Sequence, residues 1–441
     1  MNRRNETQSA IDALVTAHPD ITCRCIRRGK STATLLYVRQ IIDHNALSDL
    51  VIRPLIKFCS DAKHPPDAAS APDIIYADDF YTETDLSLIE KHLLDGMTVL
   101  LFSKDTAYLV INLKKVEKRS LPSPELSYVL RSPRDCFVEN LETNISLLRY
   151  RIKDKSMKLD TMEIGERTKS KVVVAYLDDI ANPKMIAEVK ERLQAIRTDA
   201  IIESGELASF ICQHQNSIFP QTGIVERSDL AAEGLLEGKV IIFVDGSCIA
   251  LMAPRVLNEF LYSCDDRSDS QYYALFIQIL RNLAFLLSFM SSSFYIAIAS
   301  FHIDILPASY ILQFAQMRNS VPFTAAVAVI IMEFMVELIR EALLRVPKQI
   351  GPTIGIIGGI IIGQAAIAAG FFTPVLLILI SVEMLASFAI PDYTLMIPFR
   401  IFKFLLIFFT SMLGFCGFTL GIVLILIKLA STNSFGVPYL A

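Results

Sequence analysis

The spacing of apolar and charged positions changes abruptly near residue 271. Beyond it, 22 consecutive residues without a fixed charge separate Arg281 from Asp304, and 34 such residues separate Lys348 from Glu383. A helix that crosses a bilayer needs about 20 apolar residues, so the first stretch predicts one spanning helix and the second predicts two. Residues 271–430 are therefore predicted to form an all-α transmembrane bundle of about five helices.

Glycine and proline divide these stretches further. Gly370 and Pro374 split the longer one, and Pro391 ends its second helix because proline cannot continue the hydrogen-bond ladder. In the last apolar stretch the glycines leave one kinked span, a close helix contact and a re-entrant turn all open; they are Gly414, Gly417 and Gly421. The predicted spans are 282–301, 321–339, 351–369, 373–390 and the stretch between Lys403 and Lys428.

Before residue 271 the pattern is typical of a soluble protein. Residues 21–38 alternate as strands do, residues 45–60 have helical spacing, and residues 97–113 are typical of a hairpin. Further along we expect a buried strand at 171–177, a helix at 183–196, a strand at 199–202, and a helix end with a hairpin at 234–254. Strands that alternate with helices predict an α/β or α+β region of two modules.

Composition agrees with this division. The chain has 441 residues and a net charge of −4, which argues against a nucleic-acid partner. Only eight Lys/Arg and six Asp/Glu lie from residue 271 onward. The predicted domains are a flexible arm (1–20), a first soluble module (21–130), a second soluble module with a connecting helix (131–270), the transmembrane domain (271–430) and a short tail (431–441).

Two signals predict the orientation of the chain. The first 20 residues lack the apolar core of a signal peptide, so the N-terminal region is expected in the cytosol. With that side inside, five basic residues fall in cytoplasmic loops: Arg340, Arg345, Lys348, Arg400 and Lys403. Only Arg318 and Lys428 fall outside, as the positive-inside rule requires.

A row of carboxylates begins inside the second predicted span and ends just beyond it. Glu333, Glu337 and Glu341 are spaced by four residues and share one helix face. A carboxylate that faces lipid at mid-bilayer costs about 2.5 kcal/mol or more, so this face is expected to point into the bundle or a wet cavity. Two interpretations stay open: salt bridges that hold helices in register, or a cation path lined by Glu333 and Glu337.

The basic neighbours of this row favour local pairs. Glu337 and Arg340 are three residues apart, and Glu341 and Arg345 are four apart in the favourable order. Glu383 is the other deep carboxylate and has no basic neighbour in the sequence. It is either protonated or paired with Arg281 or Lys403 from another span.

The third predicted span carries glycines at every fourth position. Gly351, Gly355, Gly359 and Gly363 form this row, and Gln364 follows it. Such a face permits close approach of another helix. The alternative is a pore-lining helix whose smooth face contacts water, with Gln364 as a polar contact.

Signals of catalysis are weak. Gly29-Lys30-Ser31 lacks the glycine that a P-loop places five residues earlier, and the six histidines show no metal-binding spacing. The eight cysteines are scattered and are expected to be reduced cytosolic thiols. We therefore predict no enzyme, cofactor or metal site.

Residues 130–154 are dense in unusual features. Arg131 and Arg134 flank Pro133, and a helical pattern follows over 135–152 with Asp135 as its N-cap. Two interpretations are open: a capped helix that joins two modules, or a basic surface that docks a partner subunit or the membrane.

Several of these motifs together resemble the A subunit of nutrient germinant receptors of endospore-forming bacteria, the GerA-type family. The segment "RSPRDCFVE" is similar to the family's R-G-P-R-E-G-F-V-E, and the matching positions are Arg131, Pro133, Arg134, Phe137 and Glu139. "VERSD" is similar to T-E-R-P-D and matches at Glu226, Arg227 and Asp229. The family pattern E-x-x-R-E-A-x-x-R-x-P-x-x-x-G matches at Glu337, Arg340, Glu341, Arg345, Pro347 and Gly351.

Other positions match or depart. Gly363, Gln364 and Pro391 match, whereas Glu383 stands where the family usually has a small polar residue, and Cys136 replaces a glycine. The chain stops at Ala441, before the family's usual extension.

The resemblance implies a multi-pass protein of the spore inner membrane with a cytoplasmic N-terminal region. It implies a complex with a polytopic B subunit and a lipoprotein C subunit, and homo-oligomers around a conduit for ion release. Conduit or helix-packing roles would fall to Glu333, Glu337, Arg340, Glu341, Arg345, Gly355, Gly359, Gly363, Gln364 and Glu383. Subunit docking would fall to Arg131, Pro133, Arg134, Phe137, Glu139, Glu226, Arg227 and Asp229. A secondary transporter or permease component and a membrane-tethered scaffold are the alternatives.

Overall fold

The computed structural model describes residues 16, 20–28, 31–39, 41–61, 67–68, 70–102, 105, 107–113, 135–212, 218–263, 266, 270–345 and 363–440. The chain divides into two compact units. Unit 1 contains residues 1–215 and 222–254, and unit 2 contains residues 216–221 and 255–441. The short segment 216–221 thus belongs to unit 2, although unit 1 flanks it in the sequence on both sides.

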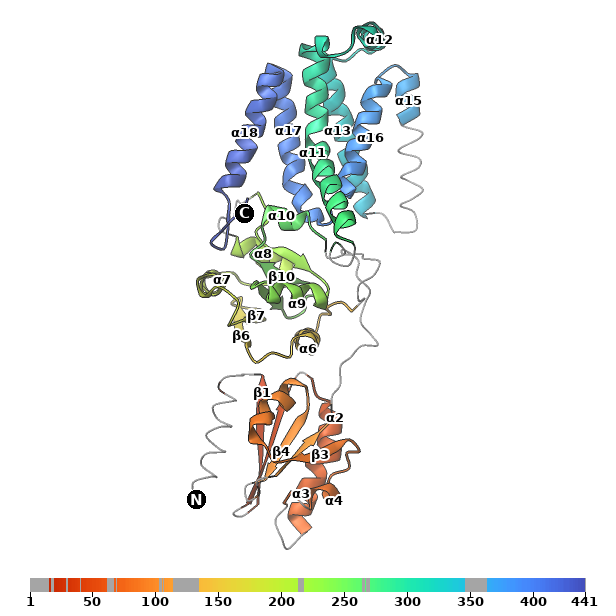
Figure 1. Cartoon of the computed structure of the whole chain (residues 1–441). Coiled ribbons are helices and arrows are strands. Elements are labelled where there is room, and N and C mark those ends of the chain that lie inside the picture. Colours follow the sequence, from red (N-terminus) through yellow and green to blue (C-terminus); the bar gives the residue numbers. More distant parts are fainter. Residues whose placement is uncertain are drawn as a thin grey trace. The chain divides into compact units, whose positions relative to one another are not determined.

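Unit 1 begins with a five-stranded sheet (Figure 1). Its strands are β1 (Ile21–Arg28), β2 (Ser31–Val38), β3 (Phe80–Glu83), β4 (Thr98–Phe102) and β5 (Tyr108–Ile111), in the order β1-β2-β4-β5-β3. Alternate residues face opposite sides, so Leu35 and Leu36 belong to different cores. The helical segments of this part are α2 (His44–Ala46), η1 (Leu47–Ile52), α3 (Arg53–Asp61), α4 (Ala71–Ile74), η2 (Leu86–Leu88) and α5 (Ile89–Leu94).

A second sheet repeats the same strand order. It contains β6 (Met157–Ile164), β7 (Ser170–Leu177), β8 (Gly223–Val225), β9 (Val240–Val244) and β10 (Ala250–Ala253), in the order β6-β7-β9-β10-β8. Every neighbouring pair in both sheets is antiparallel. The soluble region is therefore α+β, one of the two predicted classes.

The predicted strands within 21–38 are confirmed, as are the hairpins at 97–113 and 234–254, the helix near 183–196 and the buried strand at 171–177. The predicted strand at 199–202 is wrong. That segment is irregular, and its backbone carbonyls accept hydrogen bonds from the β6–β7 turn, including Arg167 N to Asp199 O at 2.8 Å. An apolar "DAII" stretch can fill a turn region as well as a strand.

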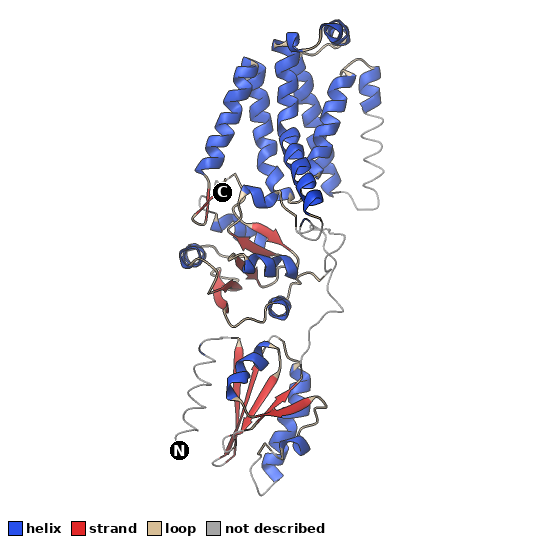
Figure 2. Ribbon diagram, in the orientation of Figure 1, coloured by secondary structure: helices blue, strands red, loops and turns tan. Residues whose placement is uncertain are grey.

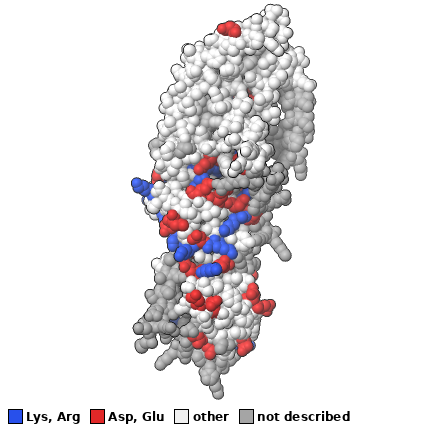
Figure 3. Space-filling model, viewed as in Figure 1, with Lys and Arg blue, Asp and Glu red and all other residues white. Residues whose placement is uncertain are grey.

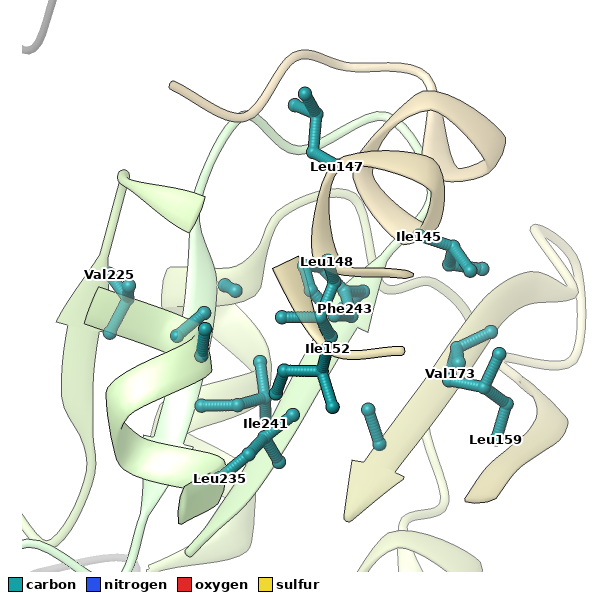
Figure 4. Packing of buried hydrophobic residues seen from close by; sticks show 14 of the residues in the cluster. Ile145, Leu147, Leu148, Ile152, Leu159, Val173, Val225, Leu235, Ile241 and Phe243 are labelled. Atoms are coloured by element: carbon teal, nitrogen blue, oxygen red, sulfur yellow. The ribbon is translucent and has the colours of Figure 1, made fainter. Parts of the chain in front are cut away.

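Helices pack on the second sheet, and two of them share a hydrophobic core with its strands (Figure 4). The helices are α6 (Leu141–Arg151), α7 (Pro183–Ala195), α8 (Ser204–Ile211) and α9 (Ser228–Leu236). Leu148 of α6 and Leu235 of α9 pack with Ile241 and Phe243 of β9 in one buried cluster. Burial of side chains of this size contributes about 1.5–3 kcal/mol each, so this core holds α6 and α9 on the sheet.

The start of α6 differs from the prediction. The helix begins at Leu141, and its N-cap is Asn140, whose side chain accepts a hydrogen bond from Thr143 N. The amide of Asn144 exchanges two hydrogen bonds with the backbone of Val138, at 2.8 and 2.6 Å. These bonds hold residues 136–140 in an extended form, so Asp135 lies outside the helix and is not its cap.

Unit 2 is mainly helical (Figure 2). Its elements are α10 (Leu257–Phe260), α11 (Gln271–Phe301), η4 (Ile303–Ile305), α12 (Ala308–Asn319), α13 (Ala325–Arg345), α15 (Gly363–Ala368), α16 (Pro374–Phe388), α17 (Tyr393–Leu413), α18 (Phe415–Ser431), β11 (Asn433–Ser434) and β12 (Val437–Pro438). Of the described helices, α11 and α17 are long and apolar enough to cross a membrane, and α16 and α18 are shorter apolar helices. The 21-residue α13 carries five charged residues.

The last apolar stretch forms two helices that meet at Gly414, not one kinked span. Gly414 has φ of 60°, a conformation that side chains disfavour, and it lies between α17 and α18. A Cβ atom on Gly417 would lie 2.0 Å from the carbonyl oxygen of Phe409, and one on Gly421 would lie 2.5 Å from Leu406 Cδ1. These two glycines therefore permit α18 to pack closely on α17.

This hairpin corrects the predicted loops. Arg400 and Lys403, expected in a loop, lie inside α17. Lys428, expected at the opposite end, lies in the last turn of α18. The chain beyond α18 returns to the end where α11 begins, because Leu257 N donates to Tyr439 O at 3.0 Å.

Two further parts of the predicted bundle are an unexpected short helix and the third predicted span. The short helix α12 between the first two predicted spans was not expected from the sequence. Most of the third predicted span, 351–369, lies outside the described residues, and α15 is the part that is described.

Candidate functional site: a buried charge network

Three carboxylates and three cations meet inside the helical bundle. They come from α13, α16 and α17, and they are Glu333, Glu337, Glu383, Arg340, Arg400 and Lys403. If all six are ionised, their formal charges cancel. The face of the bundle seen in Figure 3 carries few coloured charged atoms, and the six side chains are at most 25% exposed.

The deep layer of the network surrounds Lys403. Its Nζ lies 2.6 Å from Glu333 Oε2 and 3.0 Å from Glu383 Oε1, and all three side chains are at most 4% exposed. Ser292 of α11 contacts both carboxylates: its Oγ lies 2.6 Å from Glu333 Oε1 and in a shorter contact with Glu383 Oε2. Four helices thus meet at this point.

The outer layer surrounds Glu337. Arg340 Nη1 lies 3.0 Å from Glu337 Oε1, and Arg400 Nη1 lies 3.2 Å from Glu337 Oε2. The Arg400 guanidinium also stacks over the Tyr393 ring at 5.1 Å. One carboxylate therefore ties α13 to α17, in addition to the bond within α13.

A small cavity adjoins both layers. It has a volume of about 10 Å³, room for about one water molecule. Ser288, Tyr393 and five of the six charged residues, all but Glu337, are among those that line it. The Nε atoms of Arg340 and Arg400 are buried without a hydrogen-bond partner. A single water could accept from one of them, but the cavity is too narrow for a file of hydrated ions.

The predicted carboxylate row takes three environments along α13. The side chains of Glu333, Glu337 and Glu341 are 1%, 25% and 59% exposed. Both predicted local pairs are confirmed, with Glu337–Arg340 at 3.0 Å and Glu341–Arg345 at 2.7 Å. Exposed pairs such as the latter contribute little to stability.

Glu383 pairs with Lys403 rather than with Arg281. Arg281 binds Asp266 instead, through two contacts of 2.5 and 2.9 Å. The serine triplet 291–293 within the apolar α11 was the overlooked signal, since Ser291 and Ser292 both contact Glu383. Arg400 was not predicted to join the network, because the sequence indicated that it lies in a loop.

The glycine row does not join this site. Gly355 and Gly359 lie outside the described residues. Gly363 begins α15, and Gln364 follows it in an exposed position. Their predicted role in packing or in a pore stays a prediction.

A separate cluster in unit 1 unites the two motifs predicted to dock a partner. Cys136 and Arg227 form an antiparallel bridge, and Phe137 N donates to Glu226 O at 2.7 Å. Phe137 is buried against the Phe243 ring, 5.0 Å away, and Arg227 is fully buried and binds Asp229. These residues are placed to hold the module together rather than to offer a surface.

The remaining members of this cluster are polar. Asp135 Oδ2 accepts hydrogen bonds from Arg151 at 2.6 Å and Ser228 at 2.7 Å. Burial opposes ionisation of Asp135, but these bonds outweigh it and lower its pKa. Glu139 is exposed, and its carbonyl accepts from Gly246 N at 2.9 Å. Arg131, Pro133 and Arg134 lie outside the described residues.

Segment 216–221 anchors in unit 2 through an aromatic side chain. The Phe219 ring is buried and stacks on Phe402 at 5.3 Å, with Phe399 at 5.6 Å and Tyr439 at 5.8 Å. Gln221 O accepts from Ser434 Oγ at 2.8 Å and from Arg255 N at 3.1 Å. Phe399 and Phe402 alternate on α17 with the charged Arg400 and Lys403, so this anchor contacts the helix that carries the network.

The family comparison decides the identity. Residues 9–441 match the family described as Bacillus/Clostridium GerA spore germination protein. The chain belongs to the GerA family. The resemblance noted in the sequence motifs is thereby confirmed.

Several GerA relatives match over most of their length. The chain is 36% identical over 414 residues to spore germination protein B1 of Bacillus subtilis, which covers 93% of this chain and 85% of that protein. It is 31% identical over 425 residues to spore germination protein KA of the same organism, covering 96% and 78%. It is 32% identical over 407 residues to the uncharacterized membrane protein YfkQ of B. subtilis, covering 92% and 79%.

A solved structure is also similar. The N-terminal domain of the A subunit of the Bacillus megaterium spore germinant receptor GerK3 matches with 26% identity and a TM-score of 0.44. The match covers 57% of this chain and 94% of that one.

Proposed function

We propose that this GerA-family chain is the A subunit of a membrane-embedded nutrient germinant receptor. In this proposal unit 2 crosses the spore inner membrane several times, and the chain contributes an oligomeric conduit for ion release or the transducer that opens one. A polytopic B subunit and a lipoprotein C subunit are its partners. The names of the relatives support this role, since they are spore germination proteins and one is called a membrane protein.

The observation that carries the proposal is the buried charge network inside an apolar helical unit. A membrane helix tolerates ionisable side chains where they face the bundle interior and pair with one another. Glu333, Glu383 and Lys403 meet both conditions. Intramembrane charges of this kind mark functional elements more often than passive anchors do.

The distribution of basic residues supports a cytoplasmic N-terminal region. Lys428 lies at the end of the bundle where the chain enters α11, together with Arg340, Arg345 and Arg400 of α13 and α17. Arg318 lies in the last turn of α12, at the other end. Once Lys428 is reassigned, the described basic residues fit the positive-inside rule better than the sequence alone predicted.

The network in this form is closed. Its cavity holds about one water molecule, and its charges are paired across helices. Ion release therefore requires either separation of α13 from α17 or a conduit between subunits. A nutrient signal bound on a partner would shift the balance between two such states.

Segment 216–221 offers a route for that signal. The chain passes from unit 1 into unit 2 and back within a few residues, and Phe219 packs against α17. A displacement of this loop would act on the helix that carries Arg400 and Lys403.

Two alternatives remain distinct. A permease component would need a substrate site, and the cavity of about 10 Å³ is far smaller than a pocket for a small molecule. A membrane-tethered scaffold would use the ion pairs to hold helices in register without conduction. If unrelated helices could replace α13, α16 and α17 without loss of germination, the scaffold would be the correct description.

The direct test uses spores that carry Glu337→Gln in this chain. Loss of the charge frees Arg340 and Arg400, so nutrient-triggered cation release should fall at least tenfold while the receptor still assembles. Glu341→Gln is the matched control, because Glu341 pairs only locally with Arg345 at an exposed position. Normal release in Glu337→Gln spores with normal protein levels would contradict a role for this network.

A further inference from the structure

The contacts of Ser292 limit how many carboxylates of the deep layer can be ionised at once. A serine hydroxyl has one hydrogen and can donate it to one acceptor. Ser292 Oγ nevertheless lies within hydrogen-bond distance of Glu333 Oε1 and of Glu383 Oε2. If both carboxylates were ionised, one of these two contacts would place lone pairs against each other with no hydrogen between them.

The hydroxyl of Ser291 places a similar constraint on Glu383 Oε2. Ser291 Oγ lies 2.6 Å from Leu287 O, a carbonyl that can only accept, so that bond uses the hydrogen of Ser291. Its second contact is with Glu383 Oε2 at 3.0 Å. Ser291 therefore turns an oxygen whose hydrogen is already used toward Glu383 Oε2, and Ser292 does the same when its hydrogen goes to Glu333 Oε1.

The charged groups around Glu383 also favour one neutral carboxyl group in the deep layer. Among the described residues, the charged groups that contact Glu383 come from neighbouring helices: Glu333 from α13 and Lys403 from α17, with Ser291 and Ser292 of α11 as neutral partners. Beyond them, Arg340, Arg400 and Tyr393 line the same cavity. Lys403 supplies one positive charge against the two carboxylates of the deep layer, so this layer by itself would be net negative if both were ionised.

We propose that Glu383 binds a proton, which makes this point in the bundle a proton-binding site. Glu383 Oε2–H donates to Ser292 Oγ, Ser292 O–H donates to Glu333 Oε1, and Lys403 donates to Glu333 Oε2. Lys403 and Glu333 are then a balanced ion pair. Glu383 Oε1 is the carbonyl oxygen of the acid; it faces Lys403 at 3.0 Å yet makes no well-directed hydrogen bond.

Loss of this proton would change the packing of four helices. An ionised Glu383 would compete with Glu333 for Lys403 and would repel Ser291 and Ser292 oxygens on α11. The buried negative charge would require water or a cation, and the present cavity holds about one water molecule. The protonated acid therefore favours the closed arrangement of α11, α13, α16 and α17. This inference concerns the chain itself and does not depend on ion conduction.

The test is infrared spectroscopy of the full-length chain in lipid nanodiscs at neutral pH. A protonated carboxyl gives a C=O stretching band that a carboxylate lacks. We expect such a band in the unmodified chain, its loss in Glu383→Gln, and its retention in Glu341→Gln. Absence of the band at neutral pH, or a band that survives Glu383→Gln, would overturn the proposal.

A second measurement covers the case in which the band is obscured. The side-chain amide that Glu383→Gln introduces has the shape of the neutral acid and can donate to Ser292, so the variant should fold. Because the native state binds one more proton than the unfolded state, raising the pH by one unit should lower the folding equilibrium constant of the unmodified chain by up to tenfold relative to the variant. Parallel dependence of thermal stability on pH in the two proteins would contradict a proton at Glu383.

Discussion

Lys403 of α17 and Glu333 of α13 form a buried ion pair with 2.6 Å between Nζ and Oε2. The two residues lie 70 positions apart in the sequence, and together with Glu383 they join three helices in one contact. A pair of this kind contributes more to the choice of one arrangement than to net stability, because both charges lose their hydration. Removal of either partner alone is far more costly than removal of both.

The first prediction concerns this pair. Lys403→Met should destabilise the chain by about 3–5 kcal/mol, because Glu333 is left buried without a counter-charge. The double variant Lys403→Met with Glu333→Gln should recover most of the loss. Thermal unfolding of the full chain in detergent measures both effects. Arg345→Met, which breaks an exposed pair, should cost less than about 1 kcal/mol, and an equal cost at both positions would contradict the role of burial.

The second prediction concerns the aromatic anchor. Phe219→Ala removes a ring that packs on Phe399 and Phe402, and a buried Phe→Ala substitution costs about 3–5 kcal/mol. Nutrient-triggered cation release should be slowed or lost in spores that contain normal amounts of the protein. Ile218→Ala is the control, since Ile218 is 41% exposed and adjacent in the chain. Unchanged release in Phe219→Ala spores would show that this loop does not transmit the signal.

The third prediction uses cysteine reactivity in the second module. Burial raises the pKa of the Cys136 thiol to about 11. At pH 8 about one thiol in a thousand is then ionised, and the thiolate is the reactive species. Maleimide labelling of the full chain, followed by mass spectrometry, should modify the exposed Cys25 long before Cys136.

Labelling should change on denaturation. In urea both cysteines should react at similar rates, because the unfolded chain no longer buries Cys136. Rapid labelling of Cys136 in the native chain would contradict the bridge between residues 136 and 227.

The fourth prediction concerns the α17–α18 hairpin. Gly417→Ala would place a Cβ atom 2.0 Å from the backbone oxygen of Phe409, so the two helices must separate. The variant should lose thermal stability or fail to accumulate in the membrane fraction. Gly205→Ala is the matched control, since open space surrounds that position on α8, and it should be neutral or slightly stabilising. Comparable accumulation of the two variants would mean that the helices do not approach as closely as the structure shows.

The sequence predicted the local elements wherever a short pattern was sufficient. The strands β1 and β2 followed from alternation and the helix α7 from helical spacing, because these patterns reflect which face of an element is buried. The local pairs Glu337–Arg340 and Glu341–Arg345 followed from the geometry of one helix. The prediction of Asp135 as the N-cap of α6 was wrong. Asn140 and Asp135 are both acceptable caps by residue type, and only the hydrogen bonds of Asn144 to Val138 exclude Asp135.

By itself the sequence determined that the chain has an α+β or α/β soluble region, an apolar helical region with charged positions inside it, and the motifs of its family. These are properties of composition and of spacing along one segment. Which distant residues meet was decided by the tertiary structure. Charge gaps placed Lys403 at the edge of a helix, whereas packing of α17 between α11 and α18 buries it beside Glu333 and Glu383. Partner choice over 70 residues depends on how helices pack, and no pattern along a single helix contains that information.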